Sequence, residues 1–531
     1  MKLPIIDIFA GPGGLGEGFS SVIDSNGNRP FKIALSVEME RFAHQTLTLR
    51  SFYRQFLYTD NKEIPEDYYN YLAGYIRKEE LFARYPEEAH AACNEAINAT
   101  LGDEKNFHHE SFFDKKITQK LKGRRDWILI GGPPCQAYSL VGRARRTGGG
   151  ATEEETKEKL TEFEKDPKHK LYQQYLRIIA RHSPAVFIME NVKGILSAQH
   201  EGSLIFPRIL DDLHNPRQAI RGKWNGSGYH DEEYNVFSFF TKDLKSYDDF
   251  IIRSEDYGIP QARHRVILLG IRKDFLIKCN NFRQVLKKSS KENMNVHNAI
   301  YDLPALRSGL SKTKDGTAEW QNVVKSIPSQ SWFSELTEEI KDGLLDVVAH
   351  IDKYKFRESN RLTGKIVSPK IDWYRDPELK SICNHDTRAH IREDIYRYAF
   401  VSCFGKIKGV SPKLADFPRE LLPKHRNVKE GVTEAKFADR FRVQVATKPS
   451  TTVTCHISKD GHYFIHPDPR QVRSLTVREA ARLQTFPDNY FFEGPRTAQY
   501  QQVGNAVPPY LAYQIGKIVA RLYGIKLKED D

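Results

Sequence analysis

An apolar strand that runs directly into a glycine-rich turn is the feature that most constrains how this chain folds. Residues 4–9, Pro-Ile-Ile-Asp-Ile-Phe, have the character of a buried strand, and a G-x-G-x-x-G turn begins at Gly11. Glycines at this spacing let the backbone turn tightly and approach a ligand closely. A second strand is expected at Phe31–Val37 and ends at Glu38, whose carboxylate can accept hydrogen bonds from ribose hydroxyls. A tight turn without a ligand is the alternative.

Further short apolar segments follow along the chain, with helical segments between several of them. They are residues 127–130, 185–189 and 266–271. Alternation of this kind predicts an α/β domain with a mostly parallel sheet. Residues 61–110 separate the early strands, and Tyr68, Leu72, Tyr75 and Ile76 recur at helical spacing. We expect a helical insertion packed on the α/β core there.

The strand–helix rhythm is lost between about 273 and 470, which marks a candidate second domain rich in polar and aromatic residues. The rhythm returns at Thr476-Val477-Arg478-Glu479, a capping-box pattern that predicts a helix start. Residues 143–165 contain three arginines, three consecutive glycines and then an acidic run, so we expect a mobile loop or a surface linker.

Composition indicates a large, ordered chain with a polyanion as one candidate partner. The 531 residues include 39% hydrophobic residues, and the net charge is +12 with a pI of about 9.1. Ordinary surface charge explains the same total equally well. The six cysteines show no C-x-x-C spacing, so Cys383, His385 and His390 are not expected to bind a metal. No signal peptide or membrane span is expected, and a reducing cytosol fits a free thiol.

One cysteine stands in an unusual setting. Gly131-Gly132-Pro133-Pro134-Cys135-Gln136 follows an apolar strand, and the carboxyl end of a parallel strand is where α/β sheets place reacting groups. The two prolines stiffen the turn and would display the thiol in a fixed position. Most free cysteines are inert packing residues, and the Pro-Pro-Cys-Gln setting is what favours a nucleophile here.

Three further blocks follow, each weak by itself. Glu190-Asn191-Val192 ends an apolar strand, where a carboxyl among apolar neighbours can stay protonated or simply face water. Arg263 and Arg265 fall on the same side of the next strand and could bind a polar base edge or a phosphate. Gln502–Pro509 has the character of a turn that enters a last helix.

Taken together, the blocks resemble the DNA cytosine-5 methyltransferase family in identity and order. The matching segments are Asp7-Ile8-Phe9-Ala10-Gly11-x-Gly13-Gly14, Glu38, Pro133-Pro134-Cys135-Gln136, Glu190-Asn191-Val192, Gln261-x-Arg263-x-Arg265, Arg473-x-Leu475-Thr476-x-Arg478-Glu479 and Gly504-Asn505. The resemblance implies a Rossmann-like methyltransferase domain at 1–272, completed by 500–531. A smaller target-recognition domain would occupy 273–470, with a hinge and support segment at 471–499 and DNA between the domains.

The resemblance also implies S-adenosyl-L-methionine as cofactor, with S-adenosyl-L-homocysteine as product. Phe9 would stack on the adenine, Glu38 would bind the ribose, and Met39 would pack on the adenine where many relatives have an aromatic residue. Asp103 is the candidate for the adenine amine. The implied cofactor-binding residues are Phe9, Ala10, Gly11, Gly13, Gly14, Leu15, Glu38, Met39, Asp103, Pro134, Asn505 and Val507.

The implied catalytic residues are Cys135, Glu190, Arg263 and Arg265. A Cys135 thiolate would add to C6 of cytosine, Glu190 would bind N3 and the exocyclic amine, and Arg265 would bind O2. Arg263 would orient Glu190 or the backbone. Because a stacked base is out of reach, the cytosine must flip out of the duplex. The implied DNA-contacting loop contains Gln136, Ser139, Arg143, Arg145 and Arg146.

Other functions stay open on the sequence alone. An RNA cytosine-5 methyltransferase would share the Pro-Pro-Cys motif, and Cys403-Phe404-Gly405 partly echoes a signature of that group. A catalytically silent DNA-binding homologue and a nucleotide dehydrogenase are further alternatives. Double-stranded DNA is the expected partner, a cognate restriction endonuclease or other defence system is a candidate partner, and a monomer is a family expectation. The target sequence depends on which few side chains reach base edges.

Overall fold

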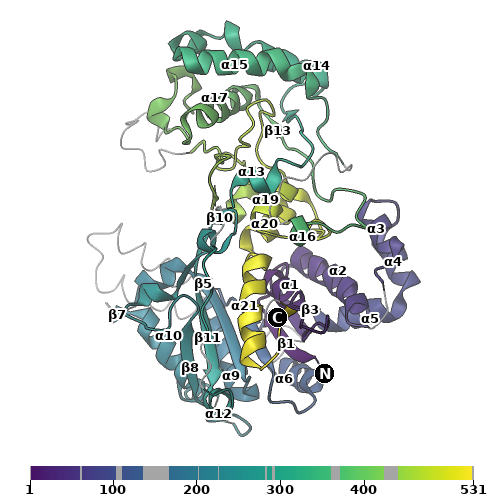
Figure 1. The fold of residues 1–531 in the computed structure, drawn as a ribbon, viewed down its shortest axis with the longest axis vertical. Helices are drawn as coiled ribbons and strands as arrows, with labels where there is room; N and C mark the ends of the chain where they lie inside the picture. The colour runs from purple at the N-terminus through teal and green to yellow at the C-terminus, as the bar shows by residue number, and fades with distance from the viewer. Residues whose placement is uncertain are drawn as a thin grey trace.

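The structure, a computed structural model, shows two lobes joined by a narrower middle region (Figure 1). The lower lobe holds the main sheet and its helices, and the upper lobe holds α14, α15 and α17. The described residues are 2–59, 63–102, 110–134, 167–200, 203–224, 226–280, 284–289, 294–359, 371–423 and 440–528. Within these ranges, no helix combines the length and the apolar character needed to cross a membrane.

The main sheet has the strand order β3-β2-β1-β4-β5-β11-β8, and β9 also pairs with β11. Strands β3, β2, β1, β4 and β5 are mutually parallel, whereas β11 is antiparallel to β5, β8 and β9. The predicted α/β class with a mostly parallel sheet is confirmed. The bounds are β1 Leu3–Ile8, β2 Phe31–Glu38, β3 Ala96–Asn98, β4 Ile128–Gly131, β5 Val186–Val192, β8 Tyr234–Ser238, β9 Ile251–Arg253 and β11 His264–Arg272.

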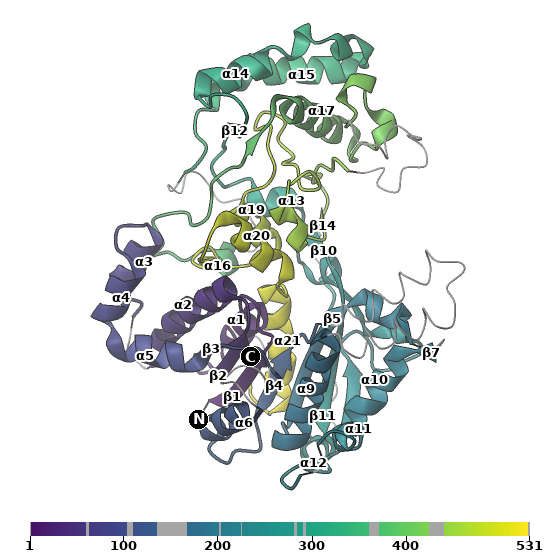
Figure 2. The same cartoon turned by 180° about the vertical axis from the view of Figure 1, so that it is seen from behind.

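Helices cover both faces of this sheet, because alternate strand residues point to opposite sides. Ile6 and Ile8 pack on the side of α6, α9 and α10, and Ile5 packs on the side of α1 and α21. Figure 2 shows α9, α10 and α11 over one face. The lower-lobe helices are α1 Gly14–Ser20, α2 Arg41–Leu57, α3 Glu66–Leu72, α4 Lys78–Arg84, α5 Pro86–Glu95, α6 Glu110–Leu121, α9 Pro167–His182, α10 Ile205–His214, α11 Pro216–Ile220, α12 Lys273–Lys278 and α21 Pro509–Leu522.

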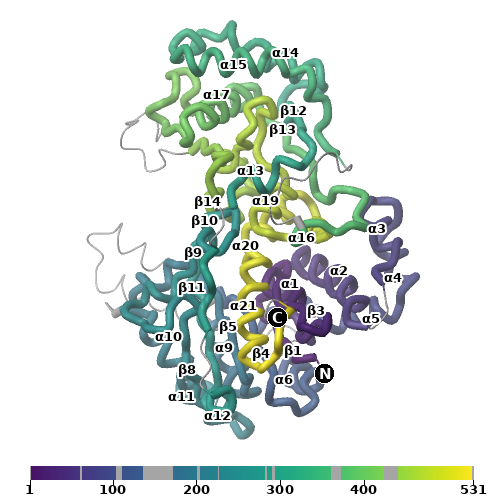
Figure 3. Tube along the Cα trace, in the orientation of Figure 1, coloured from purple at the N-terminus to yellow at the C-terminus, as the bar shows by residue number. Residues whose placement is uncertain are grey.

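The C-terminal helix α21 lies directly beside α1, so the two ends of the chain share one layer (Figure 3). Glycines permit the close approach: a Cβ at Gly18 would stand 2.4 Å from the Pro509 carbonyl oxygen. The same apolar cluster takes in Leu276 and Leu286. The sequence-based division at 272/273 stays a proposal.

The upper lobe packs around its own core, which includes Trp320, Leu344 and Phe400. Its helices are α14 Thr317–Lys325, α15 Glu338–His350 and α17 Arg392–Lys408, and the middle helices are α13 Val296–Ile300, α16 Ile371–Tyr374, α19 Val477–Leu483 and α20 Arg496–Asn505. Among the described residues, three pairs of two-residue strands complete the fold: β6 Gln199–His200 with β7 Ser203–Leu204, β10 Gln261–Ala262 with β14 Ser450–Thr451, and β12 Gly309–Leu310 with β13 Ala389–His390.

The structure corrects two local expectations and confirms a third. The span 61–110 is not purely an insertion, because β3 within it belongs to the main sheet. Tyr75 is not on the packed helical face: α3 ends before Gly74, which has a φ of +80°, and Tyr75 is 77% exposed. The predicted capping box is present, since Thr476 and Glu479 each accept the other's backbone N–H.

Candidate active site

Two turns that are candidates for binding or catalysis lie where the strand order of the sheet reverses. Strand β1 pairs with β2 on one side and with β4 on the other, so the chain leaves β1 and returns across it. The glycine turn follows β1 and the Gly132-Pro133-Pro134 turn follows β4. Ligands in open α/β sheets bind outside the carboxyl ends of the strands at such a reversal.

The backbone of the glycine turn has a conformation and close contacts that favour glycine over residues with a side chain. Phe9, Gly11 and Gly13 have φ values of 58°, 57° and 96°, the left-handed region that favours glycine. A Cβ at Gly14 would stand 2.1 Å from the Val507 carbonyl oxygen, so this glycine lets the C-terminal segment close against the turn. At Gly11, no described atom lies within 4 Å of the position of a Cβ, and the turn is open there.

Glu38 ties the glycine turn to the end of β2. Its Oε2 accepts the Gly11 N–H at 2.8 Å, and its Oε1 accepts the Glu40 N–H at 2.8 Å. Burial raises the pKa of Glu38, while these backbone donors oppose the shift. Met39 is 61% exposed beside it, and the Asn98 amide donates to the carbonyls of both residues. An acidic group and an exposed apolar side chain therefore share one rim.

These residues fit a nucleoside-containing cofactor. The open space at Gly11, the Glu38 carboxylate and the apolar side chains of Phe9 and Met39 supply a cradle, a ribose acceptor and surfaces for a base. Among the other expected contacts, Ala10 and Pro134 are half-buried, Asn505 is exposed and Val507 is buried. Leu15 is buried, and its side chain packs in the core on the α1 side of the sheet. Asp103 lies outside the described residues.

The Glu190 carboxyl is held between two neighbouring strands. Its Oε1 lies 3.0 Å from Nε of Arg265 on β11, and a Cβ on Gly132 after β4 would stand 2.9 Å from its Oε2. Both side chains are about one-seventh exposed, at 15% for Arg265 and 14% for Glu190. The contact is an ion pair without hydrogen-bond alignment, and Arg265 Nη1 donates to the His264 carbonyl. Gly132 thus gives the carboxyl room where a larger residue would displace it.

Arg263 is buried behind this pair and binds the backbone rather than Glu190. Its Nη1 donates to the carbonyl oxygens of Val453 at 3.0 Å and Gly504 at 3.3 Å. Burial and the neighbouring Arg265 lower the pKa of Arg263 to about 9, with Glu190 opposing, so it stays charged at neutral pH. These contacts are with the backbone, one of the two roles expected for Arg263, and its part in catalysis stays a prediction. We call Gly132, Glu190, Arg263 and Arg265 the catalytic edge, after the roles that the resemblance implies for the last three.

The turn that leads to Cys135 is anchored to the catalytic edge. The Asn191 side-chain amide donates to the Pro133 carbonyl at 3.1 Å, and Pro133 is buried. Strand β5 therefore positions both Glu190 and the backbone two residues before the cysteine. The remaining expected residues of this site lie outside the described ranges; they are Cys135, Gln136, Ser139, Arg143, Arg145 and Arg146.

Comparison with known sequences decides the family. The profile of the C-5 cytosine-specific DNA methylases matches residues 94–216 and 230–521. The chain belongs to this family. This methylase is a DNA (cytosine-5) methyltransferase, and Cys403, part of the echo of an RNA-modifying signature, is a buried residue of the upper-lobe core.

Individual relatives cover most of this methylase. It is 33% identical to the type II methyltransferase M.Bpa9945I of Bacillus paralicheniformis, over 97% of this chain and 98% of that one. It is 26% identical to the DNA (cytosine-5-)-methyltransferase M.ApeKI of Aeropyrum pernix, over 74% and 81%. A crystal structure of a putative prophage-encoded DNA modification methyltransferase from Escherichia coli aligns over 98% and 100% with a TM-score of 0.48 and 17% identity.

Two contributors to the site were not singled out from the sequence. Gly132 was part of the Gly-Gly-Pro-Pro segment, but its proximity to Glu190 depends on the pairing of β4 with β5. Asn191 was part of the Glu-Asn-Val block, and only the structure shows that it holds Pro133. The signal available in the sequence was their adjacency to residues already chosen.

Proposed function

We propose that this methylase modifies a flipped-out cytosine in a specific duplex DNA sequence, with Cys135 as the nucleophile. The observation that supports this most directly is the position of the Glu190 carboxyl. It is held by Arg265 and Gly132 on a strand that also anchors the Pro133-Pro134 turn preceding Cys135. A thiol that follows this turn would lie near the carboxyl, as attack on a pyrimidine ring requires.

The chemistry of cytosine assigns a role to each group. Addition of the Cys135 thiolate to C6 makes C5 an enamine-like carbon, while Glu190 hydrogen-bonds N3, where negative charge develops. Arg265 binds O2, and Arg263 fixes the backbone behind the pair. The glycine turn, Glu38, Met39 and Asn505 would hold S-adenosyl-L-methionine, which would supply the methyl group and leave as S-adenosyl-L-homocysteine. Transfer of the C5 proton to water would then expel the Cys135 thiolate from C6.

The partners are proposals of the same kind. We assign sequence reading to residues 273–470 and closure over the flipped base to the loop that contains Arg143, Arg145 and Arg146. M.Bpa9945I is named a type II methyltransferase, which supports a role beside a restriction endonuclease for this methylase as well. A monomer in the bacterial cytosol completes the proposal.

The test uses a cytosine whose release is blocked. In duplex DNA that carries 5-fluorocytosine at the target, fluorine replaces the proton whose loss frees the enzyme, so the adduct should survive denaturation. The target is first mapped by sequencing 5-methylcytosine in DNA from a host that expresses the protein. Cys135→Ala should form no adduct and lose methyl transfer by on the order of 10⁴-fold or more. Cys93→Ala, at an exposed cysteine, is the control. Methyl transfer by Cys135→Ala would overturn the mechanism.

A further inference from the structure

The insertion, here residues 63–95 with α3, α4 and α5, packs on α2 and also contacts segments far along the chain. Its α3 lies beside the connecting segment, residues 371–390, which leads from α16 to β13 and passes α3 in Figures 1 and 2. Leu379 and Cys383 of the connecting segment are buried in the same apolar cluster as Tyr68 and Leu72 of α3. The insertion therefore shares a core with a segment that sequence analysis places in the recognition domain.

Tyrosine hydroxyls supply the polar part of this junction. Tyr69 Oη donates to Asp376 Oδ2 at 2.8 Å, and Asn489 Nδ2 donates to the same oxygen at 2.7 Å. Asn489 in turn accepts a hydrogen bond from Arg50 and donates to Tyr53, both on α2. Burial, with Tyr53 and Asp376, raises the pKa of Tyr69, so its hydroxyl remains a donor.

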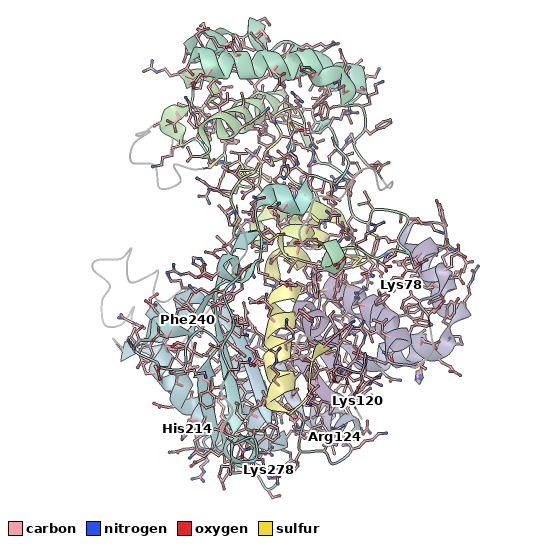
Figure 4. All side chains as sticks on the ribbon, viewed as in Figure 1. Lys78, Lys120, Arg124, His214, Phe240 and Lys278 are labelled. Atoms are coloured by element: carbon pink, nitrogen blue, oxygen red, sulfur yellow. The ribbon has the colours of Figure 1, made fainter. Side chains whose placement is uncertain are left out.

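A second contact joins the insertion to the hinge segment. Tyr71 Oη and Lys78 Nζ both donate to Glu493 Oε1, at 2.7 Å and 3.0 Å, and Figure 4 labels Lys78 in the insertion. Glu493 is also fixed through its backbone N–H, which donates to Thr46 of α2. Tyr71, Lys78 and Thr46, which lie on three different helices, thus hold one hinge residue.

Next to this shared core, the packing between the segments is incomplete. A cavity of about 310 Å³ lies between α1 and α2 on one side and the stretch from Asp372 to Pro377 on the other. At the edge of this space, Asp376 of the connecting segment accepts hydrogen bonds from Tyr69 and Asn489. Beyond Asp376 the segment continues through Thr387 to β13, which pairs with β12 of the upper lobe.

We propose that Tyr69, Tyr71 and Lys78 are positioning residues that set the orientation of the recognition domain over the catalytic edge. The inference rests on the proposed assignment of sequence reading to 273–470. None of the three lies among the residues that would touch cofactor or cytosine. Loss of the Tyr69–Asp376 link should therefore weaken productive DNA binding and relax sequence choice, while leaving cofactor binding intact.

The experiment measures kcat, KM for target duplex and KM for S-adenosyl-L-methionine in Tyr69→Phe and Asp376→Ala, with Tyr75→Phe as a matched control at an exposed tyrosine of the insertion. We expect a 3- to 10-fold rise in KM for DNA in both variants, more methylation at near-target sites, and unchanged KM for the cofactor. The double variant should be no worse than Asp376→Ala alone, because Asp376→Ala already removes the link to Tyr69. Asp376→Asn retains an acceptor and should restore most of the DNA affinity.

Each other outcome has a defined meaning. A KM for DNA in Tyr69→Phe equal to that of the wild type overturns the inference. Parallel changes in cofactor KM and melting temperature would make the link merely structural, and would overturn it too. If Tyr69→Phe does not fold, the Asp376→Ala and Asp376→Asn pair gives the same decision. Absence of DNA methylation by the wild type would instead contradict the proposed function.

Discussion

The catalytic edge and the hinge segment, residues 471–499, both contain buried arginines, but the guanidinium groups of the two regions differ in how many of their N–H groups find a hydrogen-bond acceptor. In the hinge segment, Nε, Nη1 and Nη2 of Arg473, Arg478 and Arg482 all donate to carboxylate, amide or carbonyl oxygens. In the catalytic edge, Nε of Arg263 and Nε of Arg265 have no hydrogen-bond acceptor among the described residues.

The difference separates structural from chemical use of buried charge. A buried guanidinium without acceptors is costly, so a hinge built from such groups needs every partner that it has. The catalytic edge retains guanidinium N–H groups without an acceptor beside Glu190, where we propose that the cytosine binds. Substitutions in the two regions should therefore divide between loss of stability and loss of turnover.

The largest effect is expected in the hinge segment. Arg473→Met removes the partner of Glu479, whose carboxylate is 1% exposed and accepts two of the arginine's hydrogen bonds. An unpaired buried charge typically costs about 3–5 kcal/mol in the free energy of unfolding. Urea denaturation measures it, with Arg221→Met in the exposed Arg221–Asp231 pair as a control that should change little. A loss no larger than that of the control would contradict the structural role.

The next effect should appear in turnover rather than stability. A Cβ in Gly132→Ala would stand 2.9 Å from Glu190 Oε2, and the flexible end of that side chain can move aside at small cost to the fold. A displacement of this size at a reacting group lowers kcat by about 10²-fold. Gly194→Ala is the matched control, because no described atom lies within 4 Å of its Cβ. Unchanged kcat in Gly132→Ala would remove Gly132 from the catalytic edge.

Sequence patterns predicted what depends on neighbours along the chain. The strands that end at Glu38 and near Glu190, and the capping box of Thr476 and Glu479, follow from local periodicity and spacing, and all are present. Tyr75 shows the limit of periodicity, since it continues the apolar spacing of α3 after the helix has ended at Leu72.

Partners distant in sequence were beyond such patterns. Arg263 binds carbonyls that lie 190 and 241 residues further along the chain, and Gly14 makes room for Val507. These contacts exist only once the strand order and the return of the C-terminal segment are known. The same holds for Tyr69 and Asp376, which are 307 residues apart. The order of the motifs identified the reaction, whereas the tertiary fold determines which residues support it.

The smallest predicted effect concerns acid stability of the hinge segment. His466 is buried against Arg473 and Glu479, and burial, with Arg473, lowers its pKa to about 4. The unfolded chain takes up this proton near pH 6.5, so the contribution of His466 is complete above that pH and decreases as the pH falls toward 4. The slope of the free energy of unfolding against pH is about 1.4 kcal/mol per pH unit for one histidine.

His466→Gln should lower this slope between pH 6.5 and 4 by that amount, whereas His90→Gln, at an exposed histidine of α5, should not. Unfolding free energies measured between pH 7 and 4.5 decide it: equal slopes in His466→Gln and the wild type would mean that His466 is not held neutral by the fold. Because the catalytic edge does not contain this histidine, kcat at pH 7 should be the same in both proteins.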